Sequence, residues 1–275
     1  MTAKITKPGI YDIPNGVYHS QCCDGPSISS TGLRKIRMQS PAHFWNKSDL
    51  NPDAEIDKWT PNLNFGAAAH SMILEGTLPE DQYVLKAYDN YRKNEAKKWR
   101  DDQLKDGLII FSKDDLETIT GMAESLAEHP LIKQGLFKGE IERSLFWQRD
   151  GVWLKARPDV MPVDNVITDF KTVARGGSRH TGRAVIDYGY HIQAAMICDG
   201  VKAVTGRDID HYSIMTVEKD PPYVVTHHPI MPAFIDIGRY EYRKAFEVFK
   251  TCLACLLYTS PSPRDQRGSR MPSSA

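Results

Sequence analysis

The stretch RPDVMPVDNVITDFKT, residues 157–172, places Asp159, Asp169 and Lys171 among apolar side chains. Its middle, PVDN, supplies turn-forming residues between two runs of β-prone residues, which predicts two strands joined by a turn. If the turn is centred on Asp164, the two flanking aspartates lie opposite each other on one face of an antiparallel hairpin.

This face of the predicted hairpin concentrates negative charge. Directly opposed side chains have Cβ atoms about 4.5 to 5.5 Å apart, and like charges at that separation are destabilising. A cation is therefore expected between Asp159 and Asp169, either Lys171, which alternation places on the same face, or a hard divalent ion that takes oxygen ligands. An ordinary surface ion network of the three charges is the alternative. Alternation turns Phe170 to the other face, toward the core.

The hydrophobic pattern around this stretch changes from helical to alternating along the chain. Helices are expected at 29–45, ending near Pro41, at 64–76, closed by Gly76, and at 112–129, with Ser112 as the cap. Strands are then expected at 142–148, 152–158 and 166–171, followed by a helix at 183–204, strands at 211–217 and 223–230, and a last helix after Pro232. This order predicts an α/β (α+β) fold with a central mixed sheet flanked by helices.

Composition places few limits on function. The 275 residues are 41% hydrophobic, enough for a substantial core, and Lys+Arg and Asp+Glu are both 35, so any nucleic-acid footprint must be local. The first residues lack the apolar run of a secretory signal, and no run approaches a membrane span, so we expect a cytoplasmic protein with no membrane contact. The five cysteines show no framework spacing, which indicates reduced thiols.

The last 21 residues, 255–275, change character abruptly. CLLYTSPSPRD, residues 255–265, can be encoded by the sequence of a transposase-type sequencing adaptor, and 269–275 fit the flow-cell adaptor that follows an index. We therefore expect this segment to be adaptor read-through and residues 1–254 to be native. An ordinary disordered Ser/Pro/Arg tail is the alternative. Under the adaptor interpretation, Cys252 and Cys255 imitate a metal-binding pair by accident.

The motif of Pro158, Asp159 and residues 169–171 (DFK) resembles the signature of the PD-(D/E)XK nuclease superfamily. Three companion segments point to one branch of this superfamily, the RecE-type exodeoxyribonuclease VIII family of phage and prophage recombination exonucleases. The segments similar to that family are GAAAHSMILEG (66–76), ERSLFWQRDGVWLKARPD (142–159) and YGYHIQAAMICDG (188–200). The resemblance covers about 9–253 and implies one nuclease domain. Its N-terminal helical part would span about 1–135, and 136–254 would complete a restriction-endonuclease-like core.

The resemblance also implies roles for individual residues. Asp159, Asp169 and the main-chain carbonyl of Phe170 would hold Mg²⁺ or Mn²⁺, and Lys171 would orient or deprotonate the attacking water. His70 would be a further ligand, since its helix matches the family motif, although a lone histidine in an apolar helix is ordinarily a core residue. The remaining candidates are Gln193, expected at the scissile phosphate or water, and Glu142 and Glu75, expected as auxiliary metal or catalytic groups. Ile197 stands where the family often has an aromatic residue.

Four arginines are candidate DNA contacts. Arg157 would face the site, with a salt bridge to Glu142 as its alternative. Arg175, Arg179 and Arg183 accompany the glycine-rich segment ARGGSRHTGR at a helix start, a setting suited to phosphate binding.

The function implied by the resemblance is a metal-dependent 5′–3′ exonuclease acting on linear double-stranded DNA and leaving 3′ single strands for recombination. A RecT-type annealing protein would be a partner, the bacterial host cytoplasm the location, and a homo-oligomer a further expectation. The alternatives are another PD-(D/E)XK endonuclease or repair nuclease, or a DNA-binding homologue without catalysis.

Overall fold

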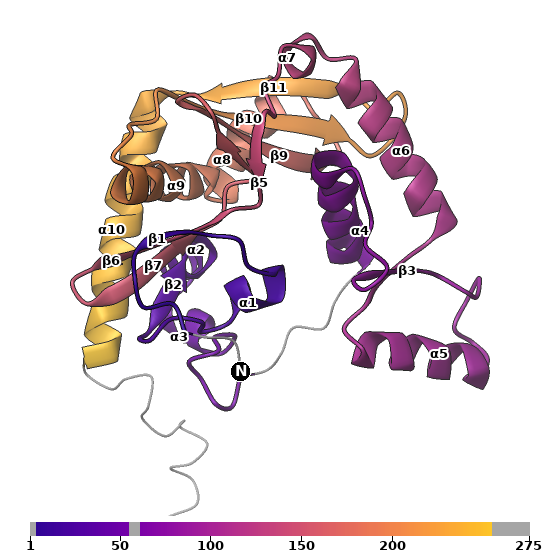
Figure 1. Cartoon of the computed structure of the whole chain (residues 1–275), viewed down its shortest axis with the longest axis horizontal. Helices are drawn as coiled ribbons and strands as arrows, with labels where there is room; N and C mark the ends of the chain where they lie inside the picture. Colours follow the sequence, from indigo (N-terminus) through magenta and orange to yellow (C-terminus); the bar gives the residue numbers. More distant parts are fainter. Residues whose placement is uncertain (1–3, 55–60, 255–275) are drawn as a thin grey trace, which may run out of the picture.

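A computed structural model describes residues 4–54 and 61–254, and the expected adaptor-encoded segment lies outside these residues. The predicted fold class is confirmed, because helices flank two larger sheets that each contain parallel and antiparallel strand pairs (Figure 1). None of the described helices combines the length and apolar character that crossing a membrane requires. Cys22, Cys23, Cys198 and Cys252 are buried free thiols.

The four-stranded sheet joins the N-terminal part of the chain to its middle. Its order is β1 (Gly9–Tyr11), β6 (Ser144–Arg149), β7 (Val152–Ala156) and β2 (Ser27–Ser29). β6 and β7 form an antiparallel hairpin whose two turn residues, Asp150 and Gly151, both have positive φ, 49° and 76°, as a tight hairpin turn requires. The N-terminal part therefore contributes two strands, neither of which the sequence pattern predicted.

The three-stranded sheet carries the predicted motif. Its order is β11 (Val225–Ile230), β10 (His211–Glu218) and β9 (Val166–Val173), with β9 and β10 parallel. Parallel strands need a crossover, and α8 (Ser178–Asp187) and α9 (Tyr190–Thr205) supply it.

The prediction of an antiparallel hairpin across 159–169 is wrong. The residues after Asp159 form β8 (Val160–Pro162), which pairs with β5 (Gly139–Ile141) and not with β9. The physical reason lies in the backbone of Phe170, whose N–H donates to the carboxylate of Asp159 and so has a side-chain partner on this edge of β9. The two aspartates therefore meet through a side chain-to-backbone bond instead of a strand ladder.

Other predicted boundaries also change. The strand expected from Glu142 begins at Ser144, because Glu142 has φ 54° and separates β5 from β6. The helix expected at 29–45 divides into α2 (Ser30–Met38) and α3 (Pro41–Trp45), where Ser40 caps a new helix that starts with proline. The helix expected at 183–204 is interrupted at Gly189, which has φ 66°.

The cap at Ser112 is confirmed: it forms a capping box with Asp115 at the start of α6 (Lys113–Ala127). The expected helix at 64–76 is α4 (Pro61–His70), which continues as a π-helical turn, η1 (Ser71–Glu75), and stops at the left-handed Gly76. The remaining elements are α1 (Asn15–His19), β3 (Tyr83–Leu85), α5 (Asn94–Lys105), β4 (Ile109–Phe111), α7 (Pro130–Lys133) and α10 (Pro232–Ala254).

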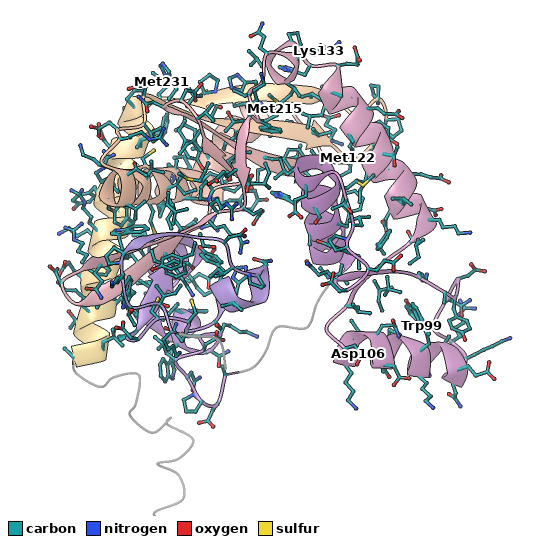
Figure 2. The ribbon with its side chains drawn as sticks, viewed as in Figure 1. Trp99, Asp106, Met122, Lys133, Met215 and Met231 are labelled. Carbon is teal, nitrogen blue, oxygen red and sulfur yellow. The ribbon has the colours of Figure 1, made fainter. Side chains whose placement is uncertain are left out.

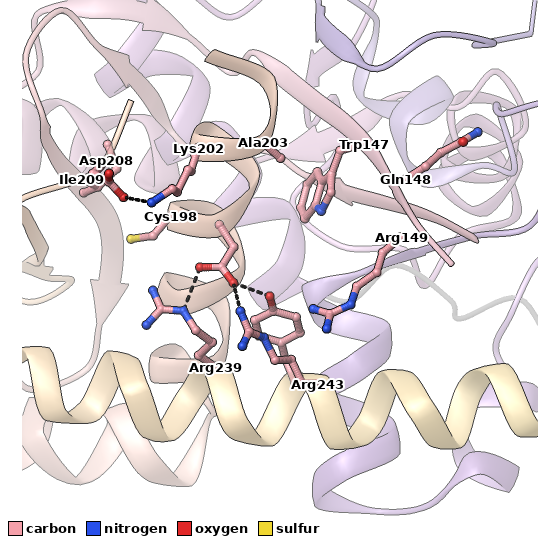
Figure 3. A pocket seen from close by; sticks show the side chains of 12 residues that line it. Trp147, Gln148, Arg149, Cys198, Lys202, Ala203, Asp208, Ile209, Arg239 and Arg243 are labelled. Carbon is pink, nitrogen blue, oxygen red and sulfur yellow. Dashed lines mark hydrogen bonds and ion pairs between the residues drawn. The ribbon is translucent and has the colours of Figure 1, made fainter. Parts of the chain in front are cut away.

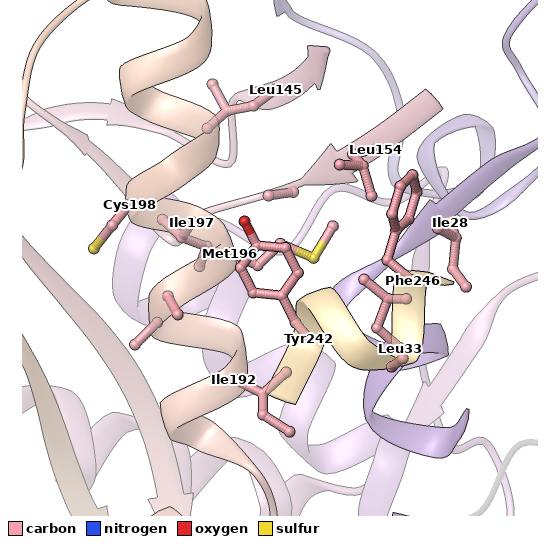
Figure 4. Close-up of a cluster of buried hydrophobic side chains, with 14 of the residues drawn as sticks. Ile28, Leu33, Leu145, Leu154, Ile192, Met196, Ile197, Cys198, Tyr242 and Phe246 are labelled. Atoms are coloured by element: carbon pink, nitrogen blue, oxygen red, sulfur yellow. The ribbon is translucent and has the colours of Figure 1, made fainter. Parts of the chain in front are cut away.

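Two large apolar clusters hold these layers together. The first packs α2, α9 and α10 against β6 and β7, with Leu33, Leu154 and Phe246 at its centre (Figure 4). The second lies between α4, α6 and β10, where Met122 and Met215 are both fully buried (Figure 2). Phe170 belongs to the second cluster with 0% exposure, so its predicted inward direction is confirmed.

Candidate active site

A cavity of about 840 Å³ opens where α4, α9 and β9 meet the N-terminal elements. Most of the predicted site residues line it: His70, Glu75, Glu142, Arg157, Asp159, Lys171 and Gln193. They come from segments more than 120 residues apart in the chain, so the cavity is assembled by tertiary packing alone.

Asp159, Asp169 and Lys171 form a connected buried group. Asp159 is 7% exposed and accepts a bond of 2.5 Å from the N–H of Phe170, while Asp169 is 2% exposed. The Lys171 ammonium forms an ion pair with Asp169 and lies 3.2 Å from the carbonyl oxygen of Phe170. Gln193, from α9, donates to the other oxygen of Asp169 at 3.2 Å. Asp169 thus has both oxygens engaged by neighbouring donors.

A second group of ligand-type atoms lies on the cavity side of Asp159. One ligand atom each from His70, Glu142 and Asp159 falls within 4.8 Å of the other two, and His70 Nδ1 is 3.8 Å from Asp159 Oδ1. Three ligands spaced evenly at about 2.1 Å from one ion are about 3.6 Å apart, so side-chain adjustments of about an ångström would let all three bind one cation. One nitrogen and two carboxylates fit a divalent ion such as Mn²⁺ or Mg²⁺.

Irregular backbone positions the side chains of His70 and Glu142. His70 is the last α-helical residue before the π-helical turn η1, and its ring packs 5.0 Å from that of Phe170. Glu142 sits at a positive φ of 54° between two strands, an uncommon conformation for a glutamate. Such irregularities concentrate at functional sites, because surrounding structure must hold them in place.

The pKa values of three acidic side chains in the site are raised, because their charged forms are disfavoured there. Burial, with the charge of Asp159 beside it, raises the pKa of Glu142 to about 7. Burial and the same Asp159 charge raise the pKa of Asp169 to about 6, and burial also raises the pKa of Asp159. Carboxylates in this state favour protonation or a bound cation over a free negative charge.

The two basic groups respond in opposite ways. Burial and the Lys171 charge lower the pKa of His70 to about 4, so the imidazole is neutral and its nitrogen can act as a ligand at neutral pH. Burial alone would lower the pKa of Lys171, but Asp169 and Asp159 outweigh it and raise that pKa. Lys171 is therefore a charged hydrogen-bond donor.

The predicted DNA-contacting arginines divide into two groups. Arg157 lines the cavity, but its Nε pairs with Glu142 Oε2 at 2.8 Å and its Nη2 donates to the Ile13 carbonyl at 3.0 Å, which is the salt-bridge alternative. Arg175, Arg179 and Arg183 do not line the cavity and are exposed on the segment after β9 and on α8.

Sequence reasoning missed several polar residues of the cavity wall. Arg34 of α2, Arg143 before β6 and Tyr190 of α9 all line the cavity. Arg143 and Tyr190 lie in ERSLFWQRDGVWLKARPD and YGYHIQAAMICDG, segments already singled out for the resemblance, so closer attention to their polar residues would have found them. Arg34 gives no comparable signal.

A second cavity, of about 610 Å³, lies along the C-terminal half of α9 and against α10 (Figure 3). At its centre Asp199 accepts bonds from Arg239 at 2.8 Å, from Arg243 at 3.2 Å and from the hydroxyl of Tyr242. The described part of the cavity wall contains four cationic side chains, Arg149, Lys202, Arg239 and Arg243, against two aspartates.

Together, the fold and the first cavity define an α/β protein with a buried carboxylate–lysine site beside three candidate metal ligands. Residues 29–256 match the family model of a PDDEXK-like domain of unknown function (DUF3799), and the chain belongs to this family. A comparison with curated proteins gave no match.

One solved structure has the same fold. A crystal structure described as a "Putative exonuclease" from Eubacterium rectale matches with a TM-score of 0.60 and 15% identity, covering 86% of each chain. An alkaline exonuclease from Laribacter hongkongensis matches with a TM-score of 0.28 and 14% identity over 70% of this chain and 96% of its own. With these TM-scores, only the first likeness bears on the fold.

Proposed function

We propose that the protein is a metal-dependent nuclease that hydrolyses DNA phosphodiester bonds in the cavity around Asp159. The observation that carries this proposal is the convergence of His70, Glu142 and Asp159 ligand atoms within 4.8 Å, beside the charged Lys171. Membership of the PDDEXK-like family and the nuclease-type fold support it.

In this proposal His70, Glu142 and Asp159 hold a divalent ion, with Asp169 and the Phe170 carbonyl beside them. Such an ion, when bound, neutralises charge on the phosphate oxygens and lowers the pKa of a water. These side chains fit the ligand role. The His70 imidazole is neutral and has a free lone pair, and a bound cation would stabilise the charged form of Glu142.

Lys171 has the role of orienting a water and neutralising negative charge at the phosphate. Its raised pKa keeps the ammonium charged, which favours donation over proton abstraction, the other role that the family resemblance allowed. The ion pair with Asp169 fixes its position, and Gln193 holds Asp169 from the opposite side.

We further propose that the activity is that of a RecE-type exonuclease of phage or prophage origin, acting 5′ to 3′ on linear duplex and supplying 3′ strands for recombination. The motif segments support this, and the E. rectale protein is described as a "Putative exonuclease". Residues 1–254 would form one nuclease domain in the bacterial cytoplasm, working with a RecT-type annealing protein and assembling as a homo-oligomer. Arg175, Arg179 and Arg183 would contact DNA outside the cavity, and Arg157 would act mainly by positioning Glu142.

The proposal is tested with purified protein and linear or covalently closed circular duplex, in Mg²⁺, Mn²⁺ or EDTA. Linear duplex should be degraded only with metal, and Asp159→Asn should abolish degradation. End-labelled substrates establish polarity. Cutting circular duplex as fast as linear duplex would exclude the exonuclease and leave an endonuclease. No degradation of either substrate, with DNA binding retained, would leave a binding homologue.

A further inference from the structure

Tyr188 is a large aromatic side chain left in solvent between α8 and α9. Its exposed fraction is 63%, so a large part of the aromatic ring is open to a flat ligand. It follows α8 directly and precedes Gly189, whose left-handed conformation, φ 66°, turns the chain into α9.

The main chain holds Tyr188 firmly in this exposed position. Arg34 of α2 donates from Nη1 to the Tyr188 carbonyl at 2.9 Å. A Cβ atom at Gly189 would lie 3.0 Å from Arg34 and from the sulfur of Met38, so α2 packs closely under the turn. These contacts involve the backbone of Tyr188 and its neighbour Gly189. A substitution that removes the Tyr188 ring therefore leaves them in place.

The ring lies next to the proposed active site. Its centroid is 5.7 Å from that of Tyr190, at an interplanar angle of 41°. Tyr190 in turn lines the cavity, and the Lys171 ammonium lies 5.8 Å from its ring centroid. Two rings this close leave no room for a third between them, so any flat ligand must stack on the outer, exposed face of Tyr188.

We infer that Tyr188 binds an unpaired nucleobase of the DNA substrate by stacking, at the rim of the cavity that contains Lys171. This inference rests on the proposed function. A nucleobase fits because it is flat, it enters the cavity joined to a phosphate, and the Arg34 guanidinium beside the turn carries the opposite charge to that phosphate. Stacking on an aromatic ring tolerates every base, so it positions a strand end without reading its sequence.

The test measures stacking directly, with the whole chain in EDTA so that the substrate survives. The probe is a linear duplex with one unpaired 2-aminopurine at its 5′ end, whose fluorescence falls when the base stacks. Wild type and Tyr188→Phe should quench it, and Tyr188→Ala should lose the quenching and bind this probe about 5- to 100-fold more weakly. Tyr240→Ala is the matched control, since Tyr240 of α10 is also 63% exposed.

The outcomes separate this inference from the function on which it rests. If wild type binds and degrades linear duplex but Tyr188→Ala quenches and binds like Tyr240→Ala, stacking is excluded while the nuclease proposal stands. If wild type neither binds nor degrades DNA, both fail. Loss of quenching in Tyr188→Ala with recovery in Tyr188→Phe supports the ring as the binding element, because both variants keep the backbone bond to Arg34.

Discussion

The helix α9 borders two aspartates in opposite electrostatic surroundings. Asp199, on the helix, accepts bonds from two arginines and a tyrosine, and cations outnumber carboxylates in its cavity. Asp169, which Gln193 of the same helix contacts, shares its buried site with Asp159 and Glu142, and the pKa values of all three acids are raised. The Asp199 carboxylate is fully paired, whereas the three carboxylates of the other cluster have only two paired cations among the described residues, Lys171 and Arg157.

This difference separates a structural use of buried charge from a functional one. Saturated ion pairs hold elements together, here α9 to α10. A group of carboxylates with too few cations costs stability, and folds keep such groups where a ligand or reaction needs them. The comparison therefore predicts that substitutions in the two clusters affect different properties.

The largest effect should come from exchanging an acid for its amide in each cluster. Asp159→Asn keeps an acceptor for the Phe170 N–H but removes the charge, so it should lower nuclease activity by at least about 10²- to 10³-fold. At pH 8 without metal its melting temperature should rise, because a stressed charge is lost. Asp199→Asn should keep activity and lose about 1 to 3 kcal/mol of unfolding free energy.

Nuclease assays and thermal melts of both variants check this prediction. If Asp199→Asn lost activity as severely as Asp159→Asn while remaining folded, the division into a structural and a functional cluster would be wrong.

Metal should stabilise the protein only through the group of His70, Glu142 and Asp159. At a concentration 100 times its Kd, Mn²⁺ should add about 2.7 kcal/mol, or about 5 to 10 °C in Tm. His70→Phe should remove most of this shift, since it keeps a ring against Phe170 but has no ligand nitrogen. Differential scanning calorimetry with and without Mn²⁺ measures each shift within one variant, which cancels packing effects. An undiminished shift in His70→Phe would place the metal elsewhere.

Metal affinity should depend on pH through Glu142. Because its pKa is raised to about 7, a bound proton competes with metal below that pH, and affinity for Mn²⁺ should fall about tenfold from pH 8 to pH 6. His70, with its pKa near 4, stays neutral across this window and contributes no slope. Calorimetric titrations at both pH values provide the measurement, with Glu142→Gln expected to give weaker binding and a flatter profile. Equal wild-type affinity at pH 6 and pH 8 would contradict this assignment.

The smallest effect is expected at the edge of the second cavity. Lys202 pairs with Asp208 at 2.7 Å, but both side chains are well exposed, 60% and 70%. Exposed pairs contribute about 0 to 1 kcal/mol, so Lys202→Ala should change unfolding free energy by less than about 1 kcal/mol and leave activity intact. Urea denaturation checks this, and a loss comparable to that of Asp199→Asn would show that the pair matters more than its exposure indicates.

The sequence predicted local chemistry better than long-range pairing. Ser112 as a helix cap, the buried direction of Phe170 and the order of the later elements follow from nearby residues. The pairing of β9 with β10 does not, because the register of a parallel pair depends on the crossover between its strands. The turn residues of 159–169 favoured an antiparallel hairpin. The hydrogen bond from the Phe170 N–H to the Asp159 carboxylate could not be inferred from the sequence pattern.

The candidate site shows the same limit. Asp159, Lys171, His70 and Gln193 were selected through motif resemblance, and the structure brings all four to one cavity, although their roles stay proposals. Arg34 required knowing that α2 packs on α9, which no periodicity in α2 reveals.

Phe170, buried between Asp169 and Lys171 of the candidate site, also limits how β9 can be misassembled. Sliding the strand by one residue would turn Asp169 and Lys171 into the apolar second cluster and force Phe170 out of it. Such a shifted form would bury two ionised groups away from the acids and donors that now surround them. Correct pairing of β9 in the sheet therefore also places Asp169 and Lys171 correctly in the site. Conformers with a shifted β9 are disfavoured by the packing energy of the core itself.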